Sequence, residues 1–150
     1  INDPYTAMSC LNRFRTALMA YLHQQRDSEN VSDTSFSWKR SRVRLEPIDL
    51  PRLCTAMFDQ TRQYMAADRN VTLHAMALLT ECAWYAGPGA ARELFREHLQ
   101  RLYSSACIQQ KDQGDTDILT QRFEAAGQII DQRNDIHRIR HETSWFGGSA

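Results

Sequence analysis

Apolar residues recur at steps of three and four positions along most of the chain, which is the spacing of one face of an α-helix. Residues 4–26 show it first, with Asp3 in the position of an N-cap and Pro4 at the first helical position. Four later segments keep the same period: 49–66, 70–86, 90–109, and a segment that starts near Asp115 or Thr116 and reaches Ile136. The pattern therefore predicts five main helices.

The segment 70–86 differs from the others because it is apolar almost all round. A helix with this composition is surrounded by other helices. Gly87 and Pro88 predict its end, since glycine accepts the left-handed conformation of a C-cap and proline cannot continue the helical turn. We expect Leu79, in the middle of this segment, to lie in the core.

Amphipathic helices joined mostly by short turns predict an all-α fold, a single compact bundle of about five antiparallel helices with the 70–86 helix at its centre. We expect one domain over residues 1–150, with an extended basic linker between the first two helices and a loose tail from about residue 147. A solenoid of paired helices would give a similar pattern, but no period of about 20 to 50 residues repeats convincingly.

The linker contains a dense cluster of positive charge, SWKRSRVRL at residues 37–45. We predict a partner-binding surface formed by five of these residues: Trp38, Lys39, Arg40, Arg42 and Arg44. Arginine binds carboxylates and phosphates bidentately, and tryptophan anchors protein interfaces or stacks on bases. Three interpretations stay open, in this order: an exposed linker whose cations balance acidic residues such as Glu46, a contact with an acidic protein, and a contact with nucleic acid.

The 150 residues carry 18 lysines and arginines and 18 aspartates and glutamates, so the formal net charge is zero. A protein that wraps a nucleic-acid backbone is usually basic overall, which makes nucleic acid the weaker alternative. The longest apolar run, residues 75–79, falls far short of the roughly 20 residues that cross a bilayer. We therefore expect no membrane partner and a cytoplasmic location. Two glycosylation-type triplets, at Asn30 and Asn70, keep a secreted or periplasmic alternative open, with a removed leader.

Four cysteines stand at positions 10, 54, 82 and 107, without a C-x-x-C pair. This spacing gives no support to a zinc ribbon or a thioredoxin-like motif. Cys54 and Cys107 occupy apolar positions of helical patterns, and Cys82 lies in the most apolar segment. Because free cysteine is often buried as a small apolar residue, we expect reduced thiols in the core.

Candidate chemistry is sparse in this sequence. His137 and His141 would share one face of a helix, as a pair of metal ligands requires, but a third ligand is missing and arginines flank them. Glu93 and Glu97 are also one turn apart, and arginines at steps of three and four predict ion pairs with Arg96 and Arg101 on an outer face.

His74 and Glu81 share one face of the apolar 70–86 helix. Buried ionisable groups need partners, and they are more often hydrogen-bonded structural groups than members of a reactive site. We therefore interpret this pair as structural.

By elimination, these observations favour a non-catalytic helical module for protein–protein interaction, such as an adaptor, a chaperone-like domain or an inhibitor. No catalytic residue, cofactor or metal is expected, and the partner is a protein with an acidic surface. Two alternatives remain: a nucleic-acid-binding domain that uses residues 39–44, and a small metal-dependent enzyme around His137 and His141.

Overall fold

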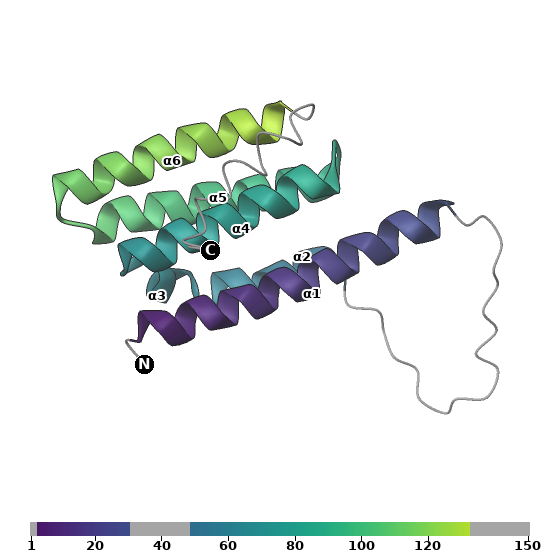
Figure 1. The fold of residues 1–150 in the computed structure, drawn as a ribbon, viewed down its shortest axis with the longest axis horizontal. Coiled ribbons are helices and arrows are strands. Elements are labelled where there is room, and N and C mark those ends of the chain that lie inside the picture. The colour runs from purple at the N-terminus through teal and green to yellow at the C-terminus, as the bar shows by residue number, and fades with distance from the viewer. Residues whose placement is uncertain (1–2, 31–48, 133–150) are drawn as a thin grey trace, which may run out of the picture.

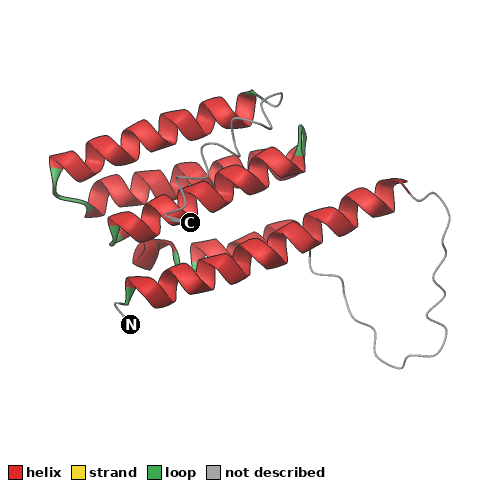
Figure 2. Ribbon diagram, in the orientation of Figure 1, coloured by secondary structure: helices red, strands yellow, loops and turns green. Residues whose placement is uncertain are grey.

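The computed structural model describes residues 3–30 and 49–132, and these form helices joined by short turns, without a strand (Figure 2). The elements in chain order are α1 (Pro4–Asn30), α2 (Leu50–Cys54), the π-helical segment η1 (Thr55–Asp59), α3 (Arg62–Ala66), α4 (Arg69–Ala86), α5 (Ala90–Gln109) and α6 (Gln113–Asp131). The prediction of an all-α fold is confirmed.

Aspartate side chains cap the N-termini of four helices: Asp3 caps α1, Asp49 caps α2, Asp68 caps α4 and Asp112 caps α6. At α4, a carboxylate oxygen of Asp68 accepts a hydrogen bond from the backbone N–H of Val71 at 3.0 Å. Such a bond satisfies a donor that the first helical turn leaves without an intrahelical partner. The cap predicted at Asp3 is confirmed, whereas α6 begins slightly earlier than expected.

The prediction of one continuous helix over residues 49–66 is wrong. The segment is helical but is divided into α2, η1 and α3. A π-helical turn holds one residue more than an α-helical turn, so the register of the backbone bonds changes here. Just beyond η1, the hydroxyl of Thr61 donates to the carbonyl oxygen of Met57. This side-chain bond competes with the helical ladder, and α3 begins only at Arg62.

The end of α1 also differs from the expectation. The helical period was expected over residues 4–26, but α1 continues to Asn30. The end of α4 is as predicted: Gly87 has a φ of 71°, and its N–H donates to the carbonyl oxygen of Trp84 at 3.2 Å. The predicted extended linker and loose tail lie outside the described residues.

Helix α4 contacts α1, α3, α5 and α6. Figure 1 shows α1 along one side of α4, with α5 and α6 on the other side. Ten of its 18 residues are buried, which explains why its sequence lacks a polar face.

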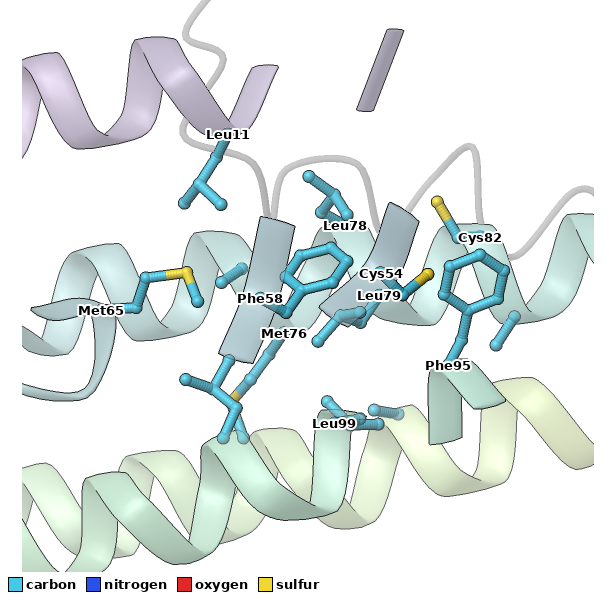
Figure 3. Packing of buried hydrophobic residues seen from close by; sticks show 14 of the residues in the cluster. Leu11, Cys54, Phe58, Met65, Met76, Leu78, Leu79, Cys82, Phe95 and Leu99 are labelled. Carbon is cyan, nitrogen blue, oxygen red and sulfur yellow. The ribbon is translucent and has the colours of Figure 1, made fainter. Parts of the chain in front are cut away.

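The core joins side chains from every part of the described chain (Figure 3). Met76 and Leu79 of α4 are each 1 % exposed, and they are close to Phe58 of η1 and Phe95 of α5. Leu11 approaches this cluster from α1. The short α2–η1–α3 segment therefore contributes side chains to the core, and α3 packs against α5.

Candidate functional site

A groove of about 830 Å³ lies between α2 and the first half of α5. One wall is aliphatic, and it consists of Leu50, Pro51, Ala90, Ala91 and Leu94. Helix α5 contributes only the small side chains of Ala90 and Ala91 to the start of this wall. Large side chains at the start of α5 would fill this space.

The other edge of the groove is charged. A guanidinium nitrogen of Arg96, Nη2, donates to Oδ1 of Asp131 at 2.6 Å, and Nε of Arg96 lies 3.6 Å from the carboxylate of Glu93. Glu97 accepts a hydrogen bond from Arg101 at 3.0 Å. The ion pairs predicted for Glu93 and Glu97 are thus confirmed. Both carboxylates remain well exposed, at 66 % and 60 %, so they are open to a ligand.

A second polar cluster surrounds Asp59, the last residue of η1. Its Oδ1 accepts from Nη1 of Arg62 at 2.8 Å and lies 3.7 Å from Nδ1 of His98, while its Oδ2 lies 3.7 Å from Nη1 of Arg101. His98 is 4 % exposed, and its ring is 5.5 Å from that of Phe58. Because 3.7 Å is longer than a hydrogen-bond distance, the imidazole and the carboxylate form an ion pair only when His98 is protonated.

Burial lowers the pKa of His98, and Arg101 and Arg62 act in the same direction, while Asp59 and Glu97 act against it. The folded protein therefore binds this proton less readily than the unfolded chain does. Between the ordinary histidine pKa of about 6.5 and the lower folded pKa, the free energy of unfolding falls as the pH falls. Above that window, His98 makes no such contribution.

We expect His98→Gln to reduce the loss of stability on acidification. The free energy of unfolding is measured by urea titration at about pH 7.5 and at steps down to about pH 5, with His98 contributing a slope of at most about 1.4 kcal/mol per pH unit. His74, whose pKa burial also lowers, keeps its contribution in both proteins. Equal slopes for parent and variant would contradict the assignment.

The four cysteines are unbonded, and their surroundings differ. Cys10 is exposed and Cys107 half-buried, whereas Cys54 and Cys82 are fully buried. Burial raises the pKa of Cys54 to about 12, with a contribution from Asp59, and it also raises the pKa of Cys82. The reactive thiolate form is therefore rare at both buried positions.

We expect a thiol reagent at about pH 8 to modify Cys10 rapidly in the folded protein, and Cys54 and Cys82 only after denaturant is added. The two groups should differ in rate by at least about a hundredfold, as expected where reaction requires opening of the core. Mass spectrometry of the modified peptides identifies each site. Equal native rates at all four thiols would show that the core is open.

The sequence-predicted partner-binding residues are not placed by the structure. Trp38, Lys39, Arg40, Arg42 and Arg44 lie outside the described residues, and so do His137 and His141. Among the side chains of the described segments, no group of three or more His, Cys, Asp or Glu is arranged to hold a metal ion. The predicted surface thus stays a prediction.

The structural interpretation of His74 and Glu81 agrees with their contacts on α1. His74 Nε2 is 2.8 Å from the amide oxygen of Asn12, and Glu81 accepts two hydrogen bonds of 2.6 Å from Arg15. Arg92, on the same helix as Glu93 and Glu97, is only 9 % exposed. Its Nε and Nη2 find no hydrogen-bond acceptor.

Sequence reasoning missed both the groove and the Asp59 cluster. The groove joins residues 50 and 51 to the start of α5, which is about 40 positions later, and no local pattern reports that contact. Three small residues in a row, Gly89 to Ala91, are the only local signal of open space. The Asp59 cluster depends on the π-helical turn, which the hydrophobic period does not reveal.

The sequence model of the family described as "Predicted membrane protein (DUF2254)" matches residues 1–81, more than half of the chain. The chain belongs to this family. No curated protein and no solved structure matches it. In the part of the chain that the structure describes, no helix has both the length and the apolar character needed to span a bilayer.

This family membership corrects three expectations. The exclusion of a membrane and the cytoplasmic location are wrong, because the family is described as a membrane protein. The interaction module with an acidic protein partner, inferred by elimination, is contradicted for the same reason. The cause of the error is physical: an amphipathic helix of a water-facing bundle has the same pattern whether or not a membrane lies beside it.

Proposed function

We propose that this chain is a helical domain that works at a membrane surface, where residues 38–44 bind anionic lipid headgroups. The observation that carries the proposal is the density of charge there: Lys39, Arg40, Arg42 and Arg44 stand within six residues. A cluster of cations near an anionic bilayer gains about 1 kcal/mol for each lysine or arginine. Trp38 supports the same proposal, since tryptophan favours the headgroup region of a bilayer.

The surface of the described helices supports a position in water beside the membrane. Charged side chains link different helices across that surface, as in the pairs Arg15–Glu81, Arg69–Asp115 and Arg96–Asp131. All three pairs are partly exposed, and such charges are stable in water but costly in hydrocarbon. In this proposal, the chain is one domain whose helices form a single bundle of alternating direction.

Partition onto vesicles tests the proposal. The protein is sedimented with vesicles of phosphatidylcholine, with and without phosphatidylglycerol, over a range of salt concentrations. Four cations at about 1 kcal/mol each correspond to partition about a thousandfold stronger onto the anionic vesicles. The preference should weaken with salt, because screening shortens the range of the attraction. Equal partition onto both compositions would overturn the proposal.

A further inference from the structure

The groove between α2 and α5 has two kinds of lining, and neither takes part in the proposed binding by residues 38–44. Its wall is aliphatic, and its edge alternates in charge through Glu93, Arg96 and Glu97. We infer that the groove holds one phospholipid with an ethanolamine headgroup, its acyl chain along the wall and its headgroup at the edge. The inference rests on the proposed function only in placing this chain at a lipid surface.

The dimensions of the groove fit an acyl chain. Lining residues run from Ala90 to Gln100 on α5, a distance of about 15 Å along the helix axis. The volume of about 830 Å³ falls within the usual range for small-molecule sites. Ala90 and Pro51 are exposed and Leu94 is half-buried, so this aliphatic surface is accessible without unfolding the core.

The charges at the edge match a headgroup that carries an ammonium beside a phosphate. Glu93 and Glu97 lie one helical turn apart, and a primary ammonium can donate hydrogen bonds to both carboxylates. Arg96 lies between them, and its buried Nε makes no hydrogen bond although it is 3.6 Å from the carboxylate of Glu93. A phosphate oxygen would supply an acceptor when the guanidinium group exchanges its contact with Asp131 for one in the groove.

The same charges select against other headgroups. Choline has no N–H and cannot donate to Glu93 and Glu97, so it loses the hydrogen bonds that ethanolamine makes. A headgroup with a net negative charge meets the two carboxylates of Glu93 and Glu97 at this edge, against the single guanidinium group of Arg96, which is also paired with Asp131. The expected order of affinity is ethanolamine, then choline, then glycerol.

The test uses the full chain and short-chain lipids that stay monomeric, namely dihexanoyl forms of phosphatidylethanolamine, phosphatidylcholine and phosphatidylglycerol, with binding measured by calorimetry. Phosphatidylethanolamine should bind saturably at one site, at least about tenfold more tightly than phosphatidylcholine, which is the expected value of one to two charged hydrogen bonds. O-phosphoethanolamine, which has the headgroup without acyl chains, should bind at least about tenfold more weakly, because burial of the chain is lost. Saturable binding of the free headgroup at full affinity would assign the site to a soluble phosphate ester and overturn the inference.

Two variants test the two halves of the groove. Ala90→Trp places an indole in the aliphatic space and should abolish binding, whereas Ala17→Trp, at an exposed position of α1, should leave it unchanged. Glu93→Gln with Glu97→Gln should remove the preference for ethanolamine over choline and retain the affinity for phosphatidylcholine. Circular dichroism verifies that each variant is folded.

Failure of this inference is distinguishable from failure of the proposed function. Reversal of Arg42 and Arg44 should leave the binding of monomeric lipid unchanged while it weakens attachment to anionic vesicles. Absence of saturable binding, insensitivity to Ala90→Trp, or equal affinity for the three headgroups would each overturn the inference. Light scattering tests whether a second copy of the chain fills the groove instead. A dimer that Ala90→Trp dissociates would show this and would also overturn the inference.

Discussion

Leu79→Asp is expected to lower the free energy of unfolding by at least about 4 kcal/mol. Leu79 lies in the middle of α4 and is 1 % exposed. The substitution removes an apolar side chain from a packed core and places a carboxylate where no water can solvate it. Because small domains have a total stability of about 5 to 15 kcal/mol, the variant should be largely unfolded at moderate temperature. Thermal and urea melts followed by circular dichroism measure the change.

Ile108→Asp is the matched control for this variant. Ile108 is also helical and aliphatic, but it is 82 % exposed near the end of α5. The same chemical change should alter the stability by no more than about 0.5 kcal/mol, as is usual for surface positions. A Leu79→Asp protein that melts with its parent would show that α4 is not the centre of the core.

The sequence predicted well what depends on local periodicity. The apolar character of residues 70–86 predicted the buried helix α4, Asp3 predicted the start of α1, and Gly87 predicted the end of α4. The segment 49–66 kept the helical period too, yet it contains η1. A π-helical turn shifts the register by a single residue, and the average period over the segment hardly changes.

The candidate sites were predictable to different extents. The positive stretch at residues 38–44 is visible in the sequence because its members are adjacent. The ion pairs of Glu93 and Glu97 were predictable for a similar reason, since each spans a single turn of one helix. The groove and the contact between Asp59 and His98 were not, because each depends on how α5 packs against the α2–η1 segment.

The expectation of no membrane rested on the lack of an apolar run long enough to cross a bilayer, and the description of the family contradicts it. The length of an apolar run says nothing about a helical domain that lies beside a bilayer, which is the position we propose for this chain. The 18 positive and 18 negative side chains cancel over the whole chain. Attraction to an anionic bilayer, however, acts over about 8 Å in physiological salt, so in the proposed role the local cluster matters more than the total charge.

The difference between local and total charge can be tested at Arg42 and Arg44. Reversal of Arg42 and Arg44 to glutamate should weaken binding to phosphatidylglycerol-containing vesicles by at least about 30-fold, since two lost cations remove about 2 kcal/mol. The two new carboxylates add repulsion, so the true loss should be larger than this bound. The measurement is vesicle sedimentation at fixed salt, with the melting temperature of each protein determined in parallel.

Arg13→Glu with Lys111→Glu is the control, because it makes the same change in net charge at two exposed positions, one on α1 and one between α5 and α6. If only total charge mattered, both double variants would lose vesicle binding to the same extent, and the assignment to residues 38–44 would be wrong. A strong fall in the melting temperature of the Arg42 and Arg44 variant, without a specific loss of lipid binding, would instead show that these arginines stabilise the fold. Loss of binding at unchanged stability, confined to the variant in the basic segment, is the result that the lipid-binding role requires.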